Sequence, residues 1–411
     1  MSLFYVPNLA LLLLLLLFGV SHTGGYTAPT QPFTLWNTTS SHCEKQFGPI
    51  DLPDTPARAF VDGDGNTVLV SVDTTGRLSY GPSFFQLTRD CTIVHNASKD
   101  SNPANYAANE FLDATYSYGN GTVIAILHDE YPGDNYNNCS VTPKTWPSCW
   151  TVSLSLAISQ DYGRSWAHTS PPPTNLVAAV PYPYESTRTI FGWGDTGGIL
   201  RDPRDGMFYM AAYNRMTKGL QDNGTCVMRT STLMDSTSWR GWNGSDFSVP
   251  FTSAYTLPPG TESSHICTVL DPAVFPPPCV LYGYTWSIYL ELFIATVNCN
   301  EMALPTGQNR TIFYTTSNDF VHWMPLKVLL EPTILPAWHV NMLTYPALLD
   351  ATAPSRGDKN YGSIGQTATL TYVHGTQDFF LYGRQLMGVN VTFEKTRAIE
   401  GGKEEVRVII G

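Results

Sequence analysis

Apolar residues are grouped in short runs that are separated by turns containing Gly, Pro, Asn or Asp. One pattern recurs along the chain: an extended run, a turn, and a second run rich in β-branched residues. The recurring pairs of runs begin at Ala57, Phe111, Gly197, Ile266 and Tyr345. Since β-branched and aromatic residues favour the pleated sheet, these runs predict β-strands joined as hairpins.

A repeated strand pair that extends along most of the chain predicts an all-β fold. Radial repetition of one antiparallel unit is typical of a β-propeller, which leaves few strand edges exposed. The long insertions between the units favour this architecture, because in a propeller they all lie at the rims. We therefore predict a β-propeller, preferably with five blades, and keep a two-sheet sandwich as the alternative.

The segment 111–166 contains the clearest of these units. Asn120 and Gly121 lie between two apolar runs, and Asn-Gly in that position is a strong hairpin signal. The second run, residues 122–127, is almost continuously apolar, which predicts a strand covered on both faces. This run ends in three titratable residues, His128, Asp129 and Glu130.

Charge limits the kinds of partner. The formal net charge of −11 argues against nucleic acid or an anionic membrane, because both require a cationic face on the protein. Only 14% of the residues are charged, which is low for a helical protein. The abundant Tyr, Trp, Gly and Pro suit short strands and turns instead.

The N-terminal residues predict an exported protein. Residues 9–18 are apolar, too few to span a bilayer, and small and polar residues follow them, so we expect a signal peptide over residues 1–24. No later stretch is long and apolar enough to cross a membrane, and we expect a soluble, extracellular monomer. Residues 25–394 are expected to form one propeller domain, and residues 395–411 a C-terminal tail.

Cysteines and glycosylation sequons agree with export. Eight cysteines follow the predicted signal peptide, and their even number fits disulfide bonds in an oxidising compartment. We expect Cys139 to pair with Cys149. Sequons predict a glycoprotein, and they begin at Asn37, Asn96, Asn120, Asn138, Asn223, Asn243, Asn309 and Asn390.

Two short segments resemble turns of known propeller families. Residues 159–166, SQDYGRSW, resemble the Asp-box of sialidases, a turn between the outer strands of a blade. Residues 316–323, TSNDFVHW, are similar to a turn in the five-bladed glycoside hydrolases of families 43 and 32. The resemblance implies a glycosidase-like propeller, with a six-bladed sialidase-type propeller as the alternative. It also implies that Asp161 and Asp319 hold turns and are not catalytic.

Position in the predicted hairpins separates the candidate site residues from the turns. In an antiparallel hairpin, the start of the first strand and the end of the second lie at the same edge. That edge collects the catalytic candidates, which are Glu130, Asp113 and Asp195. It also collects the substrate-binding candidates, which are Arg58, Arg77, His128, Asp129, Trp193, Tyr213, Arg215, Trp286 and His374. The opposite edge receives Asp62, Asp64, Asp202, Asp205 and Asp350.

These residue types point to glycoside hydrolysis, which needs one protonated and one ionised carboxyl group across the scissile bond. Glu130 follows an apolar strand whose burial raises the pKa of the carboxyl group, so we expect it to be the general acid. Asp113 or Asp195 is the expected base. Aromatic rings and arginines suit sugar rings and their polar groups.

Each candidate also has a structural interpretation. A carboxylate at a strand end can anchor a loop, His128 and His374 can hold hydrogen bonds, Trp193 and Trp286 can pack between blades, and Arg58 and Arg215 can form structural ion pairs.

The sequence contains no nucleophilic-serine elbow, phosphate-binding glycine loop or zinc signature, which excludes the corresponding enzyme classes. We predict a secreted glycoside hydrolase-like protein that acts on poly- or oligosaccharide by carboxylate acid/base chemistry in the central funnel. The alternatives are an exo-sialidase-like enzyme and a non-catalytic carbohydrate-binding or effector propeller. No cofactor or metal is predicted; some relatives hold a cation in the channel, but nothing in this sequence indicates one.

Overall fold

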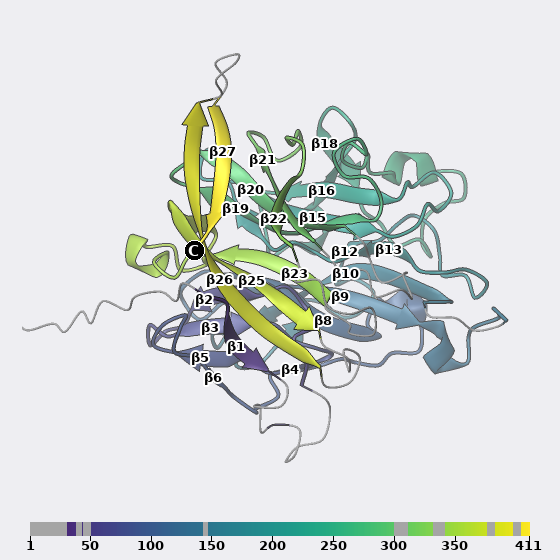
Figure 1. The fold of residues 1–411 in the computed structure, drawn as a ribbon. Coiled ribbons are helices and arrows are strands. Elements are labelled where there is room, and N and C mark those ends of the chain that lie inside the picture. The colour runs from purple at the N-terminus through teal and green to yellow at the C-terminus, as the bar shows by residue number, and fades with distance from the viewer. Residues whose placement is uncertain are drawn as a thin grey trace, which may run out of the picture.

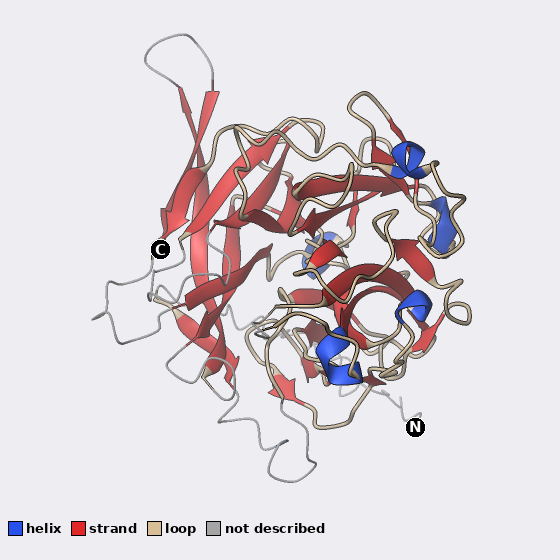
Figure 2. Ribbon diagram, turned by 90° about the vertical axis from the view of Figure 1, so that its right-hand side faces the viewer, coloured by secondary structure: helices blue, strands red, loops and turns tan. Residues whose placement is uncertain are grey.

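The computed structural model describes residues 31–37, 43, 51–142, 147–299, 311–331, 342–375, 383–397 and 404–411. The named elements in these residues are β-strands and short 3₁₀ helices, and Figure 2 shows the helices in loops between the strands. The 3₁₀ helices are η1 (Pro103–Asn105), η2 (Gly133–Tyr136), η3 (Ser236–Ser238), η4 (Glu262–His265) and η5 (Pro354–Arg356). None of the described helices is long and apolar enough to cross a membrane.

The described strands form five successive antiparallel meanders. The first consists of β2 (Arg58–Val61), β3 (Thr67–Val70), β5 (Ser79–Gly81) and β6 (Thr88–Arg89), beside the small pair β4 (Thr75–Gly76) and β7 (His95–Asn96). The second consists of β8 (Asn109–Ser117), β9 (Val123–Pro132) and β10 (Trp150–Ser159), with β11 (Ala167–His168) and β12 (Leu176–Ala178) both on β10. The third consists of β15 (Phe208–Asn214), β16 (Gly224–Thr230), β17 (Arg240–Trp242) and β18 (Phe247–Pro250), with β13 (Phe191–Gly194) and β14 (Leu200–Arg201) both on β15.

The fourth and fifth meanders complete the arrangement. The fourth consists of β19 (Cys279–Ser287), β20 (Leu292–Cys299), β21 (Ile312–Ser317) and β22 (Lys327–Leu330), with β24 (Ser363–Ile364) on β19. The fifth consists of β23 (Met342–Leu349), β25 (Thr367–Gly375) and β26 (Arg384–Arg397), with β1 (Phe33–Asn37) and β27 (Glu404–Ile410) both on β26. Figure 1 shows the fifth meander between the first, in purple, and the fourth, in green.

The innermost strands contact one another around a ring. β2 contacts β8, β15 contacts β19, β19 contacts β23, and β23 contacts β2. The second and third meanders are also joined directly, since β13 runs parallel to the start of β10. The predicted all-β propeller is confirmed. The number of blades stays a prediction that the five meanders support.

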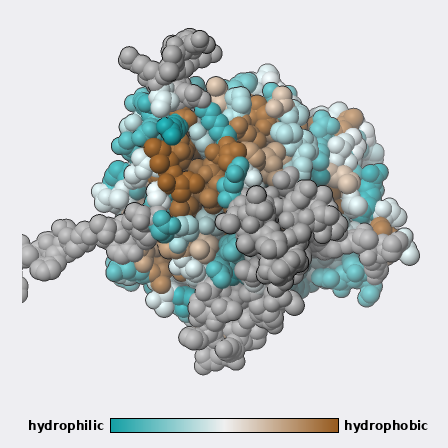
Figure 3. Space-filling view, viewed as in Figure 1, coloured by the Kyte–Doolittle hydropathy of each residue, from teal (hydrophilic) through white to brown (hydrophobic). Residues whose placement is uncertain are grey.

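β26 joins both ends of the described chain in one sheet. Its first half pairs with β1, where Phe33 lies opposite Gly388, and its second half pairs with β27, where Ile410 lies opposite Val391. Residues predicted as a C-terminal tail therefore contribute a strand, β27. The predicted domain boundaries stay predictions. Val328 on β22 and Ile409 and Ile410 on β27 are exposed apolar side chains. Figure 3 shows a hydrophobic area on the face seen in that view.

β9 shows why the apolar runs form interior strands. Residues 123–127 are fully buried. The side chains on one face pack against apolar side chains of β8 and the first meander, and those on the other face pack toward the third meander. The prediction of a strand covered on both faces is confirmed. Burial of such a run stabilises the folded sheet over the unfolded chain by about 25 cal/mol for each Å² of apolar surface removed from water.

Four disulfide bonds connect described cysteines. They are Cys43–Cys91, Cys139–Cys149, Cys226–Cys267 and Cys279–Cys299. The predicted pairing of Cys139 with Cys149 is confirmed. This bond closes the loop that follows β9, next to the end of the strand that carries the titratable residues.

Asp161 holds the turn between β10 and β11. Its carboxylate accepts hydrogen bonds from the Ser159 hydroxyl at 2.7 Å and from the Ser165 backbone N–H at 2.9 Å. The Trp166 indole N–H donates to the Gly163 carbonyl at 3.0 Å, which folds the ring back over the turn. The side chain thus serves the turn, as the resemblance implies.

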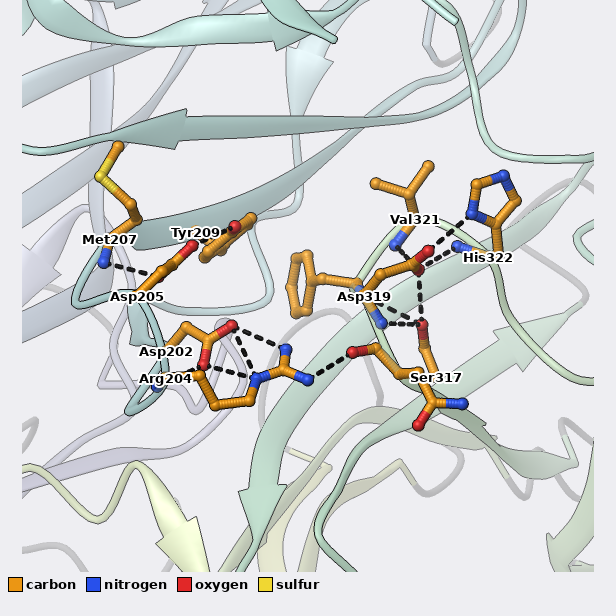
Figure 4. A network of polar contacts seen from close by, with 11 residues as sticks. Asp202, Arg204, Asp205, Met207, Tyr209, Ser317, Asp319, Val321 and His322 are labelled. Atoms are coloured by element: carbon orange, nitrogen blue, oxygen red, sulfur yellow. Dashed lines mark hydrogen bonds and ion pairs between the residues drawn. The ribbon is translucent and has the colours of Figure 1, made fainter. Parts of the chain in front are cut away.

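Asp319 does the same between β21 and β22 (Figure 4). It accepts from the backbone N–H groups of Val321 at 3.0 Å and His322 at 2.7 Å. Figure 4 also shows the neighbouring β14–β15 turn, where Arg204 bonds to Asp202 and donates to the Asn318 carbonyl at 2.6 Å. Arg204, which Asp202 holds in place, therefore links the turn of the third meander to the turn of the fourth.

The loop between β23 and β25 lies at the face where these turns lie, which we call the turn face. The Asn360 side chain accepts from the Ser117 N–H at 2.6 Å and donates to the Ser117 carbonyl at 2.9 Å. The Gly362 carbonyl accepts from the Trp286 N–H at 3.1 Å. One loop of the fifth meander thus contacts the second and the fourth, beside a cavity of about 450 Å³ that Trp286 and Asn360 help to line.

The fourth unit differs from its prediction. We expected a first strand at residues 266–270 and residues 279–286 as its return, but β19 is the first strand and pairs with β20. Val269 makes only an isolated bridge, to Cys226. The direction of β19 is therefore reversed relative to the prediction, and its C-terminal end, with Trp286, lies at the turn face.

Candidate active site

The candidate site lies at the face opposite these turns, where strand ends from different meanders converge. Glu130 lies two residues before the end of β9, Asp195 follows β13, and Arg215 follows β15. Asp54 precedes β2, and Arg384 begins β26. The negative charge of Asp54 raises the pKa of both Glu130 and Asp195, after burial as the larger cause, which places the three carboxyl groups in one electrostatic environment.

Glu130 combines burial with access to a cavity. Its side chain is 20% exposed and lines a cavity of about 440 Å³ together with Phe111, Trp150 and Asp73. Burial raises the pKa of Glu130 to about 8, and the nearby Arg215 only partly opposes this. Glu130 is therefore protonated at neutral pH and open to a ligand, as a general acid must be.

Asp113 lies deeper, on β8. Its Oδ2 accepts hydrogen bonds from the Thr196 N–H at 2.8 Å and the Thr196 hydroxyl at 3.0 Å, and the residue is only 1% exposed. Burial raises the pKa of Asp113 to about 7, against the positive charge of Arg58. A carboxyl group this enclosed bonds to neighbouring residues and has little access to a sugar.

Asp195 is bound by Arg215. The two side chains form an ion pair, and Asp195 is 5% exposed. Burial raises the pKa of Asp195, while Arg215 opposes the shift. Asp195 also has a φ of 50°, in the left-handed region that non-glycine residues seldom adopt. Backbone strain of this kind persists only where the surrounding structure enforces it, often at functional sites.

Asp54 is a functional candidate that the sequence reasoning missed. Its side chain is 20% exposed, forms an ion pair with Arg384, and accepts a hydrogen bond from the Tyr345 hydroxyl at 3.1 Å. Tyr345 also has a left-handed φ, of 52°. Asp54 lies just before the first strand of the first unit, so the hairpin rule would have found it if loop residues before the strand had been included.

Several predicted residues lie beside the site and serve the structure. The Arg58 guanidinium donates to the carbonyls of Ala57 at 2.7 Å and Tyr282 at 2.8 Å, and burial lowers the pKa of Arg58. Asp129 points to the other side of β9 and accepts from the Ala108 N–H and the Ser153 hydroxyl. Both groups are thereby committed to neighbouring elements.

Other predicted residues are buried elsewhere or lie at the other face. Trp193 is fully buried in the core, Arg77 is fully buried and donates to the Cys91 carbonyl, and Tyr213 is buried and donates to Asn223. His374 lies within β25 between Leu343 and Gln385, half-buried, and burial lowers the pKa of its ring. Trp286 lies at the turn face under Arg204, whose guanidinium carbon is 4.8 Å from its ring centre.

The structure therefore brings together Glu130, Asp113, Asp195, His128, Arg215 and Arg58, and adds Asp54, Tyr345 and Arg384. In the described part of the chain no group of three or more His, Cys, Asp or Glu side chains is arranged to hold a metal ion. The chemistry available at this site is that of carboxyl groups with raised pKa values beside carboxylates in ion pairs.

No protein-family model and no curated protein sequence matches the chain. Similar solved structures include an exo-1,5-α-L-arabinanase from a bovine ruminal metagenomic library, with 9% identity over 87% of this chain and 97% of that chain and a TM-score of 0.47. They also include the family 43 endo-arabinanase of Bacillus licheniformis, with 9% identity over 82% of this chain and 95% of that chain and a TM-score of 0.46. A third is the catalytic domain of the family 62 α-L-arabinofuranosidase of Coprinopsis cinerea, with 10% identity over 87% of this chain and 94% of that chain and a TM-score of 0.43. These likenesses are distant, and we argue the function from the side chains.

Proposed function

We propose that the chain is a secreted glycoside hydrolase-like protein that cleaves poly- or oligosaccharide with Glu130 as the general acid. The observation that carries the proposal is the environment of Glu130, which is partly exposed to a cavity while burial raises its pKa to about 8. An acid that keeps its proton at neutral pH can protonate the leaving-group oxygen of a glycosidic bond.

The second carboxyl group is Asp54 or Asp195, and we assign the role to Asp54. Its side chain is 20% exposed, whereas Asp195 is 5% exposed and Asp113 is 1% exposed. The ion pair with Arg384 and the hydrogen bond from Tyr345 hold the Asp54 carboxylate in place. Preorganised groups of this kind avoid reorganisation during the reaction.

The cavity wall supports a saccharide as the ligand. Phe111 and Trp150 provide aromatic surface, and Asn109 and Asn135 provide amide groups that bond to hydroxyls. A sialic acid substrate is less well supported, because Arg215 and Arg384 are each paired with an aspartate and Arg58 bonds to backbone carbonyls. The disulfide bonds and the apolar N-terminal segment support export.

A non-catalytic carbohydrate-binding propeller is the second candidate. It is favoured by the ion pairs of Asp54 and Asp195, since each carboxylate is already bound by an arginine. This protein would bind saccharide in the same cavity without cleaving it.

The test compares wild type, Glu130→Gln and Asp54→Asn on a panel of aryl glycosides and natural glycans. Removal of a general acid or base is expected to lower kcat by about 100-fold or more. The control is Glu291→Gln, the same chemical change at an exposed turn between β19 and β20. Activity that survives in Glu130→Gln would exclude the acid assignment. Saccharide binding without turnover in wild type would favour the second candidate.

A further inference from the structure

His128 lies at the centre of the site, between two of its carboxyl groups. Its Nε2 is 3.5 Å from Glu130 Oε1, and its Nδ1 is 3.9 Å from Asp113 Oδ2. The ring is 6% exposed and packs against the Phe111 ring, with 5.8 Å between the ring centres. Gly194 leaves the space that the ring occupies, since a Cβ there would lie 3.0 Å from both Cε1 and Nε2.

One hydrogen bond determines the tautomer of this ring. The backbone N–H of Asp195 donates to His128 Nδ1 at 3.3 Å. A backbone N–H is only a donor, so Nδ1 must present its lone pair and cannot carry a proton. In a neutral imidazole the proton then resides on Nε2, which is the nitrogen nearest to Glu130.

The surroundings keep the ring neutral. Burial and the positive charge of Arg215 lower the pKa of His128 to about 3, with Asp54 opposing. The charged and titratable groups around the ring come from five elements: Glu130 on its own strand β9, Asp113 on β8, Asp195 after β13, Arg215 after β15, and Asp54 before β2. At neutral pH Nε2–H is thus a fixed, uncharged donor.

We propose that His128 is a positioning residue whose Nε2–H donates to Oε1 of Glu130, so that the acidic proton of Glu130 resides on Oε2. The separation of 3.5 Å is longer than an ordinary hydrogen bond, and catalytic hydrogen bonds often shorten when the substrate binds. The proposal rests on the proposed function in one respect, that Glu130 is the acid.

The donor also serves the reaction step. The Oε2 proton is transferred to the glycosidic oxygen, and the C–O bond breaks with its electron pair on that oxygen. The carbon that loses this oxygen forms a new bond to an oxygen of water or of the second carboxyl group, and Glu130 is left as a carboxylate. Nε2 is buried, has no hydrogen-bond partner among the described residues and lies 3.5 Å from Oε1, so its proton stabilises the carboxylate that forms more than it stabilises the neutral acid. His128 itself neither gains nor loses a proton.

The first test needs no turnover. Protein labelled with ¹⁵N-histidine is examined by NMR from pH 5 to pH 8, and the His128 signals are identified by their loss in His128→Gln. We expect Nε2 to be protonated, Nδ1 to be unprotonated, and neither signal to titrate in this range. A proton on Nδ1, or titration near the ordinary histidine pKa, would overturn the proposal whether or not the protein is an enzyme.

The second test separates positioning from packing. His128→Ala removes the donor, and His128→Gln keeps an N–H close to the position of Nε2. We expect kcat to fall about 10- to 100-fold in His128→Ala with little change in KM, and His128→Gln to recover most of the loss. Equal losses in the two variants, or a loss confined to KM, would overturn the positioning role. A wild-type protein without activity would reject the proposed function, and the ¹⁵N spectrum would still decide the tautomer.

Discussion

Glu130→Gln is expected to stabilise the fold at neutral pH, which is the reverse of its expected effect on activity. Burial raises the pKa of Glu130 from 4.5 to about 8. The unfolded chain releases this proton above about pH 4.5 while the folded protein holds it until about pH 8, so rising pH favours the unfolded state in that window. At 1.36 kcal/mol per pKa unit, the loss of folding free energy is about 1 kcal/mol at pH 5 and about 3 kcal/mol at pH 7.

Glutamine has nearly the same shape and cannot ionise, so the variant avoids this loss. Urea unfolding followed by tryptophan fluorescence, with disulfides intact, gives the free energy of unfolding of both proteins at each pH. The free energy of unfolding of Glu130→Gln is expected to exceed that of wild type by about 2 kcal/mol more at pH 7 than at pH 5. Glu291→Gln, at an exposed turn, is the control and is expected to show no such difference.

The same gain at both pH values would refute the reasoning, because a carboxyl group with an ordinary pKa is ionised in the folded and unfolded states alike over most of this range. A loss of stability at pH 7 would refute it as well. Either result would also remove the main support for Glu130 as the acid.

Three further outcomes follow from the same structure. The kcat/KM of an active protein is expected to fall as pH rises above about 8, where Glu130 loses its proton, and a profile flat to pH 10 would contradict this. Because the pKa of His128 is lowered to about 3, the unfolded chain gains a proton below about pH 6.5 that the folded protein does not. Between pH 7 and pH 5 the free energy of unfolding of wild type, measured in urea, is therefore expected to fall by about 2 kcal/mol relative to that of His128→Gln. Asp161→Ala is expected to cost about 1 to 3 kcal/mol of stability with kcat unchanged, since its carboxylate holds the β10–β11 turn; a change in kcat at full stability would contradict the structural role.

The strand pairs that were predicted well are those whose signals are local. Residues 123–127 are apolar throughout and follow Asn-Gly closely, so both the strand and the position of Glu130 near its end could be inferred from adjacent residues. The turn-holding role of Asp161 likewise depends on hydrogen bonds within a few residues. Local hydrogen bonding and alternation are the properties that a single sequence reports.

The features that were missed depend on distant partners. Asp54 gains its role from Tyr345 and Arg384, which are brought to it only when the fifth meander closes against the first. Trp286 was misplaced because the apolar residues 266–270 resembled a first strand, and only pairing with β20 shows that β19 takes that place. Nothing in the order of residues reveals such long-range pairing.

The pairing of β1 with β26 has a consequence for how the protein is made. A ribosome releases β1 before any other described strand, yet its partner in the sheet is made only after the other meanders. β1 cannot pair with β26 until residues 385–388 have been made. Arg384, the first residue of β26, is likewise made late and can reach Asp54 no earlier. The candidate site is completed when the ring is completed, so a chain released too early would lack both.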